Sequence, residues 1–249
     1  MGTAMPDFNG RRCDNAPMNL LAIETATESC SVALLHGDML IDRSELAPRR
    51  HAELVLPMAA ELLAEAGIAR TQLDGIAVGR GPGAFTGVRL AVSLAQGMAY
   101  ALDRPVLPVS TLAALAMQAP EANAAILALT DARMGEIYAG TFVRQPDGLV
   151  VSLGGEQVCV PDALTLPAVP SWSVVGNGWD AHAEVLEARL TGVAWEVVSD
   201  AIWPQARDVA RLAAPLLTRG EGVEAKDALP VYLRDKVALT MAERGVAQS

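Results

Sequence analysis

The chain has 249 residues, of which 51% are hydrophobic and 4% aromatic, and its net charge is −10. It is long enough for one large domain or two small ones with an aliphatic core. The acidic balance argues against a protein that holds RNA through a basic surface of its own, because Arg49-Arg50 is the only compact basic cluster of the globular stretch.

Cysteine usage and hydropathy predict a cytoplasmic protein. The three cysteines Cys13, Cys30 and Cys159 are odd in number and far apart, which favours a reducing compartment without a disulfide framework. No apolar run reaches the roughly eighteen residues that a membrane span needs. Residues 1–17 lack the apolar core of a signal peptide, and we expect a disordered extension or a start site placed too early.

The first globular stretch predicts three antiparallel strands. Residues 20–23 form a short apolar run that ends in the polar turn 24–29. Residues 30–35 continue as a second strand, and the turn at 36–38 leads into a third strand at 39–43.

Two helices follow, at 52–66 and 88–102, and both are more apolar than surface helices usually are. Each has a single polar stripe, and Pro57 predicts a kink or a late start in the first helix. One interpretation is that their own sheet and each other bury both helices. The other is that they expose an apolar patch to a partner subunit. The candidate interface residues are Leu54, Met58, Leu62, Val88, Ala91, Leu94, Ala95 and Met98.

Between these helices lies a glycine-rich segment. Residues 76–78 predict a buried strand, and Gly79, Gly81 and Gly83 with Pro82 exclude a helix there and permit tight backbone with positive φ. Thr86 is the expected N-cap of the second helix. The segment fits neither the P-loop nor the dinucleotide fingerprint, so a tight strand-to-helix turn is favoured over a phosphate cradle.

The pattern then repeats. A strand at 105–109 leads to Ser110, which caps a helix at 111–118, and we place a boundary after Pro120. Strands at 124–129, 136–143 and 149–153 repeat the order of the opening three. We therefore expect an α/β duplication of the actin and Hsp70-like ATPase type, with a mixed sheet and flanking helices in each lobe.

The remaining segments complete this division. A strand begins at 174, helices follow at 182–190 and 205–217, and a solvated connector covers 218–227. The expected units are an N-terminal lobe at 18–120, a C-terminal lobe at 121–217, and a partly frayed segment at 218–249 that packs back on the lobes.

No set of residues predicts catalysis or metal binding. The three histidines have no partner at helical spacing, and there is no Cys-x-x-Cys pair or nucleophile elbow. Glu24 and Asp131 occupy equivalent turns of the two halves, where an actin-like fold places phosphate-binding carboxylates. A structural role is favoured, because no lysine completes such a site. The candidate nucleotide or phosphate residues are Glu24, Thr25, Thr27, Asp131, Arg133, Gly176 and Asn177.

Five sequence motifs, in the same order, resemble the TsaB family, which is also called YeaZ. They lie at 21–34 with 51–58, 79–89, 109–112, 131–133 and 230–234, and the similarity spans roughly 18–236. Met18 coincides with the usual start of the family. The motif residues to which we assign a structural role are Gly79, Gly81, Pro82, Gly83, Thr86, Gly87, Arg89, Tyr232 and Arg234.

The resemblance implies a non-catalytic subunit of the bacterial machinery that places threonylcarbamoyl on N6 of adenosine 37 in tRNA. The catalytic paralogue TsaD carries a metal-binding His-x-x-x-His. In the corresponding stretch this chain has His51, but Val55 stands four residues later, where the second histidine would be. Family members are expected to pair with TsaD through the two helices, to be joined by the ATP-binding subunit TsaE, and to self-associate when alone. ATP or ADP and tRNA are expected only at the level of the complex. Glu24 departs from the aspartate often found in the family, which weakens an inherited role in nucleotide binding.

Two other functions stay open. The first is a stand-alone ATP-binding kinase or ATPase of the same fold, which turnover of ATP by the isolated chain would reveal. The second is a peptidase, which older family labels suggest and which the absence of metal ligands in the sequence disfavours.

Overall fold

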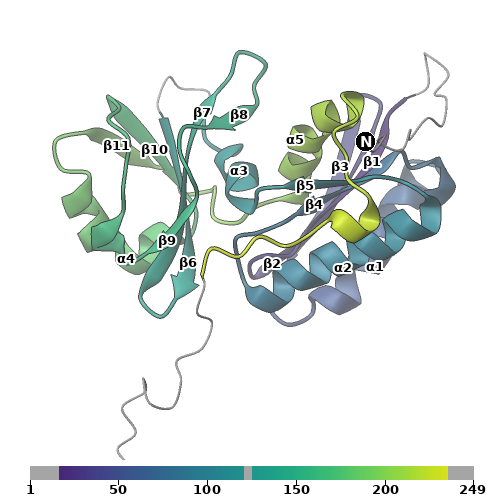
Figure 1. Ribbon diagram of the computed structural model, residues 1–249, viewed down its shortest axis with the longest axis horizontal. Coiled ribbons are helices and arrows are strands. Elements are labelled where there is room, and N and C mark those ends of the chain that lie inside the picture. The colour runs from purple at the N-terminus through teal and green to yellow at the C-terminus, as the bar shows by residue number, and fades with distance from the viewer. Residues whose placement is uncertain (1–16, 121–124, 235–249) are drawn as a thin grey trace, which may run out of the picture.

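The computed structural model describes residues 17–120 and 125–234. The predicted extension at 1–17 lies outside the described residues except for Pro17, and so does the end of the C-terminal segment. Two mixed sheets form the centres of two lobes (Figure 1). None of the described helices is long and apolar enough to cross a lipid bilayer.

The first sheet has the strand order β3-β2-β1-β4-β5. The predicted antiparallel start is confirmed, since β1 pairs with β2 and β2 with β3, while β4 and β5 continue in parallel to β1. Gly37, with φ of 59°, makes the tight turn between β2 and β3. The strands are β1 (Asn19–Glu24), β2 (Ser29–His36), β3 (Met39–Leu46), β4 (Gly75–Gly79) and β5 (Val106–Val109).

Helices cover both faces of this sheet. The helices α1 (His51–Glu65) and α2 (Phe85–Leu102) pack on one face, where Leu21 and Ile23 of β1 point. The helix α5 (Ala206–Thr218) packs on the other face, against Leu20 and Ala22. The alternation along β1 therefore supplies two separate hydrophobic cores.

The second sheet repeats the first. Its order is β11-β10-β6-β7-β8, with β6, β7 and β8 antiparallel and β10 and β11 parallel to β6. The predicted duplication is thus present in the strand order. The strands are β6 (Ala125–Arg133), β7 (Glu136–Arg144), β8 (Val150–Ser152), β10 (Ser171–Val175) and β11 (Ala194–Val197), and the short β9 (Gln157–Cys159) also pairs with β7.

The last helix of each half of the chain packs on the sheet of the other half. The helix α3 (Thr111–Ala116) follows β5 but packs mainly on β6 and β7, whereas α5 follows β11 and packs on the first sheet. Our division at residues 120 and 217 therefore needs correction, because it assigned each of these helices to the lobe that precedes it in the chain. The second lobe keeps α4 (Gly178–Arg189) on its outer face.

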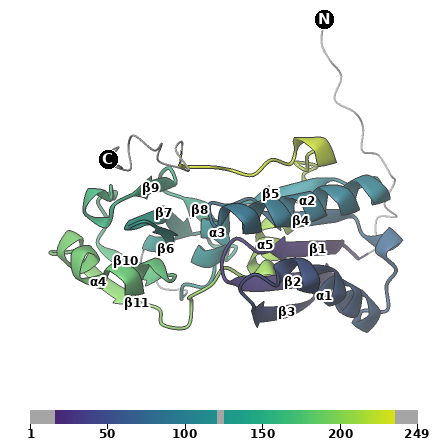
Figure 2. The same cartoon turned by 90° about the horizontal axis from the view of Figure 1, so that it is seen from below.

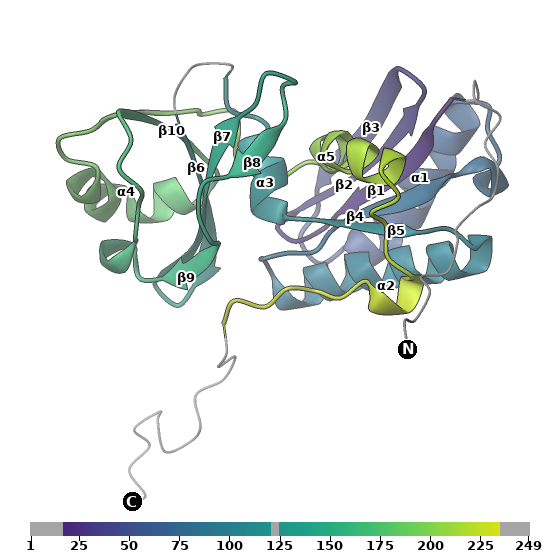
Figure 3. The same ribbon diagram turned by 45° about the horizontal axis from the view of Figure 1, so that its top comes forward.

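The C-terminal segment runs back over the first lobe and then toward the second (Figures 2 and 3). Val223 bridges to Val106 of β5, and Gln96 of α2 donates to the carbonyl of Ala228 at 2.9 Å. A 3-10 turn, η3 (Ala225–Asp227), lies on α2. The other 3-10 turns are η1 (Arg70–Gln72) and η2 (Pro161–Ala163).

Several element boundaries differ from the prediction. Thr86 is not the N-cap of α2, because the helix begins at Phe85 and its N-cap is Ala84, without a side-chain cap. The strand expected at 124–129 is longer, since β6 continues to Arg133. Ser110 does cap α3, accepting a hydrogen bond from the amide of Ala113 at 3.0 Å. The strands β9 and β11 were not predicted.

Candidate functional site

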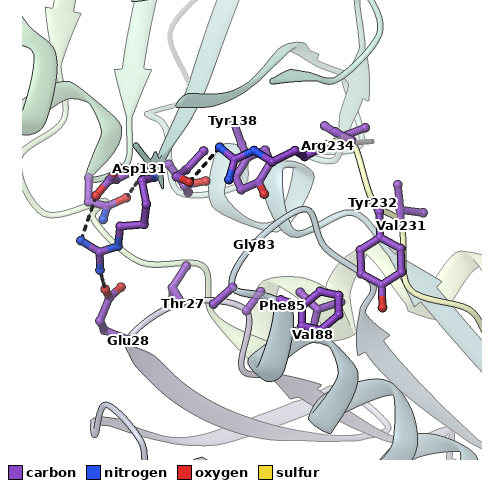
Figure 4. Close-up of a pocket in the computed structure, with 17 residues that line it drawn as sticks. Thr27, Glu28, Gly83, Phe85, Val88, Asp131, Tyr138, Val231, Tyr232 and Arg234 are labelled. Carbon is purple, nitrogen blue, oxygen red and sulfur yellow. Dashed lines mark hydrogen bonds and ion pairs between the residues drawn. The ribbon is translucent and has the colours of Figure 1, made fainter. Parts of the chain in front are cut away.

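A cavity of about 230 Å³ lies between the lobes. Its lining comes from the β1–β2 turn, the start of α2, the β6–β7 region and the C-terminal segment (Figure 4). Among the candidate nucleotide residues, Thr27, Asp131, Arg133 and Asn177 line it.

The glycine-rich loop after β4 is shaped by close packing. Of its first three glycines only Gly81 has a positive φ, 93°. A Cβ on Gly83 would lie 2.5 Å from the carbonyl oxygen of Ala26, and one on Gly87 would lie 2.0 Å from that of Thr25. Gly81 therefore uses the positive φ that the sequence permits, whereas Gly79 and Gly83 are required because a side chain or other backbone comes too close for a Cβ.

Glu24 and Thr25 do not line the cavity, which corrects their place in the nucleotide set. Glu24 is fully buried, and its carboxylate accepts hydrogen bonds from the amide of Ala26 at 2.7 Å and from Oγ1 of Thr111 at 2.9 Å. Burial raises the pKa of Glu24 to about 7. Thr25 is also buried and donates to the carbonyl of Gly87 at 2.8 Å. Glu24 thus joins the β1–β2 turn to α3, and Thr25 joins it to α2.

The opposite wall belongs to the second lobe. The amide of Asp131 donates to Oδ1 of Asn177 at 3.2 Å, and Asp131 pairs with Nη1 of Arg133 at 3.0 Å. Arg133 also pairs with Glu28 of the first lobe, so this ion pair crosses the cavity edge (Figure 4). Gly176 has a structural role away from the cavity lining, since a Cβ there would lie 2.0 Å from the carbonyl oxygen of Leu129.

The C-terminal segment forms the third wall. Arg89 donates from Nε to the hydroxyl of Tyr232 at 2.6 Å, and its guanidinium lies 3.7 Å from the ring centroid of Phe85. Arg234 donates to the carbonyl of Ala132 at 3.1 Å and pairs with Glu136. The motif residues Arg89, Tyr232 and Arg234 thus fasten this segment to both lobes. Sequence reasoning missed Phe85 and Glu28, whose positions show no pattern by themselves.

The helices α1 and α2 bury most of the candidate interface residues. Five of the eight candidate interface residues, Met58, Leu62, Val88, Ala91 and Ala95, are buried in the core of the first lobe. They therefore lie beneath the surface, which corrects the prediction for those positions, while Leu54, Leu94 and Met98 are half-buried.

The remaining apolar surface lies on other faces of the same helices. On α2 the polar stripe of Arg89 and Gln96 contacts the C-terminal segment, and the face beyond it carries small and apolar residues. We call this set the helix surface. It consists of Leu56, Ala60, Leu63 and Ala64 on α1 and Leu90, Leu94, Gly97, Met98 and Ala101 on α2, all of them exposed or half-buried.

No metal centre is evident in the described ranges. No three His, Cys, Asp or Glu side chains within 17–120 and 125–234 lie close enough together to hold a metal ion. Val55, four residues after His51, is fully buried in the core of the first lobe.

Comparisons with known proteins agree with the motifs. A family model described as "TsaD: tRNA N6-adenosine threonylcarbamoyltransferase" matches residues 44–241. The tRNA threonylcarbamoyladenosine biosynthesis protein TsaB of Escherichia coli is 37% identical over 89% of this chain and 96% of its own length. The protein of the same name from Haemophilus influenzae is 39% identical over 88% of this chain and 95% of its own length. The chain belongs to the TsaB family.

A solved structure extends the similarity to three dimensions. YeaZ from Pseudomonas aeruginosa has 45% sequence identity and a TM-score of 0.79, covering 87% of this TsaB chain and all of the compared chain. The duplicated strand order and this similarity together give the TsaB chain the two-lobed actin-like fold.

Proposed function

We propose that this TsaB chain is a non-catalytic subunit that binds and activates TsaD in the N6-threonylcarbamoyl modification of adenosine 37 in tRNA. The helix surface carries this proposal. It presents leucine, methionine and alanine side chains and the bare backbone of Gly97 on two neighbouring helices, and small residues allow a partner helix to approach closely. In this proposal TsaE joins the pair formed by this chain and TsaD. The tRNA is contacted through the complex rather than by this chain alone, because this chain is acidic.

Substitutions on the helix surface test the proposal. Ala60→Glu on α1 and Ala101→Glu on α2 place a charge at exposed positions, so the fold is retained while a buried apolar interface is disrupted. Ala188→Glu, at an exposed position of α4 in the second lobe, is the matched control.

The measurement is size-exclusion chromatography with light scattering, on the chain alone and mixed with TsaD. We expect a homodimer through the helix surface that gives way to a one-to-one heterodimer. Both Glu variants on the helix surface lose the complex, and the control keeps it. An undisturbed complex in both variants would show that TsaD binds elsewhere.

The cavity between the lobes supports a second candidate, an ATP-binding enzyme. Asp131, Arg133 and Asn177 meet there beside the start of α2, where helix amide groups favour an anion. Turnover of ATP by the isolated chain that Asp131→Ala abolishes would establish this candidate instead.

A further inference from the structure

A second cavity, of about 510 Å³, lies where the lobes meet and shares no lining residue with the first. Strand β3, the end of α3, the loop before α5 and the first turns of α5 contribute to it. The lining residues are Leu40, Asp42, Met117, Gln118, Val198, Asp200, Ala201, Arg207, Asp208 and Arg211.

Asp208 is the buried group of this cavity. It is 1% exposed, and its Oδ1 accepts a hydrogen bond from Nη1 of Arg211 at 3.3 Å. Its Oδ2 accepts no hydrogen bond from any described residue, and Nε of Arg207 lies 3.9 Å away, beyond hydrogen-bond distance. A buried carboxylate oxygen without a donor is destabilising, so this oxygen points to a donor supplied from the cavity.

Other charges in the lining are also unsatisfied. Within the described ranges, the side chains of Asp42 and Asp200 make no hydrogen bond or ion pair, and Arg207 makes only the 3.9 Å contact. The acidic groups are too dispersed to hold one metal ion together. Three carboxylates and two guanidiniums in one cavity complement a ligand that carries both signs of charge.

Apart from Gln118, whose amide donates to the carbonyl of Trp203 at 2.8 Å, the uncharged lining is apolar. Leu40, Met117 and Val198 offer a surface for a hydrocarbon chain. We propose that this cavity binds a free aliphatic α-amino acid, with its ammonium group at Oδ2 of Asp208 and attracted by the charges of Asp42 and Asp200, its carboxylate at Arg207 and Arg211, and its side chain on these three apolar residues. The site is independent of the helix surface and of the proposed partner.

Three related probes test the requirement for both charges. L-Leucine has both groups, 3-methylbutylamine lacks the carboxylate, and 4-methylpentanoate lacks the ammonium group. We expect isothermal titration calorimetry with the full chain to show binding of L-leucine, with each analogue at least about tenfold weaker. Equal binding of the amine would mean a simple cation site and would overturn the proposal, as would the absence of heat with L-leucine.

Variants then locate the site. Arg207→Gln and Asp42→Asn alter one charge of each sign at side chains outside the hydrophobic core, and each should weaken L-leucine at least about tenfold. The matched controls are Arg219→Gln and Asp180→Asn, at exposed positions that do not line the cavity. Unchanged affinity in both test variants would place any binding elsewhere and refute the assignment.

Discussion

Glu24 and Gly79 share one space in the first lobe, since a Cβ on Gly79 would lie 1.9 Å from Oε2 of Glu24. The strands β1 and β4 are adjacent and parallel, so their ends lie side by side. The carboxylate of Glu24 at the end of β1 occupies the space that a side chain at Gly79 of β4 would need. This relationship explains why the first glycine of the motif is needed although it is not in a left-handed conformation.

Glu24 should make the stability of the protein depend on pH. Its folded pKa, about 7, lies above the ordinary value of 4.5, so the folded chain binds more protons in this interval than the unfolded chain. The stabilisation is complete below pH 4.5 and is lost as pH rises through 7, by about 3 kcal/mol in total. We expect Glu24→Gln to remove this slope and to exceed the wild type in stability at pH 8.

Urea denaturation across this pH range measures the effect. The comparison is clearest above pH 6, because burial raises the pKa of Asp208 to about 6, and the contribution of Asp208 to the slope declines as pH rises above that value. The exposed Glu187→Gln is the control and should keep the wild-type slope. A slope in Glu24→Gln equal to that of the wild type would contradict the assignment.

The glycines of α2 allow a paired test. Gly87→Ala would place a Cβ 2.0 Å from the backbone oxygen of Thr25, so we expect a loss of more than about 2 kcal/mol in the free energy of unfolding. Gly97 lies in the same helix with nothing within 4 Å, and Gly97→Ala should stabilise the helix by up to about 1 kcal/mol. Urea midpoints of the two variants should therefore shift in opposite directions, and equal shifts would refute the packing explanation.

The ion pair between Glu28 and Arg133 connects the lobes but should contribute little. The side chain of Arg133 is 70% exposed, and exposed pairs are worth at most about 1 kcal/mol. A double-mutant cycle with Glu28→Gln and Arg133→Gln should give a coupling energy below that limit. A clearly larger coupling would mean that the pair is a principal connection between the lobes.

Tyr232 should hold the C-terminal segment through two separable contacts. Tyr232→Phe removes the hydrogen bond from Arg89 and keeps the ring contact with Phe85, whose centroid lies 5.6 Å away. Tyr232→Ala removes both. We expect limited proteolysis at 228–234 to be modestly faster in the Phe variant than in the wild type, and much faster in the Ala variant. Equal rates for the wild type and both variants would show that other contacts hold the segment.

The sequence predicted the strands of both halves except β9 and β11, because the apolar runs and turn residues of the others are local signals. The difference between Thr27, which lines the cavity, and Glu24, which is buried three residues earlier, depends on how the turn packs against α2 and α3. No local pattern carries that information. The burial of Ala91 and Ala95 could not be predicted either. Helix α2 is apolar both on the face that packs on its sheet and on the face that belongs to the exposed helix surface.

The crossing of α3 and α5 between the lobes has a consequence for synthesis on the ribosome. The second core of the first sheet, around Leu20 and Ala22, needs Val209 and Ala213 of α5, which are made about 190 residues later. One face of the earliest strands therefore stays uncovered until the helix that ends at Thr218 has left the exit tunnel. During that interval a nascent chain of this protein presents an apolar sheet face to chaperones, and truncated translation products end without the helix that would conceal it.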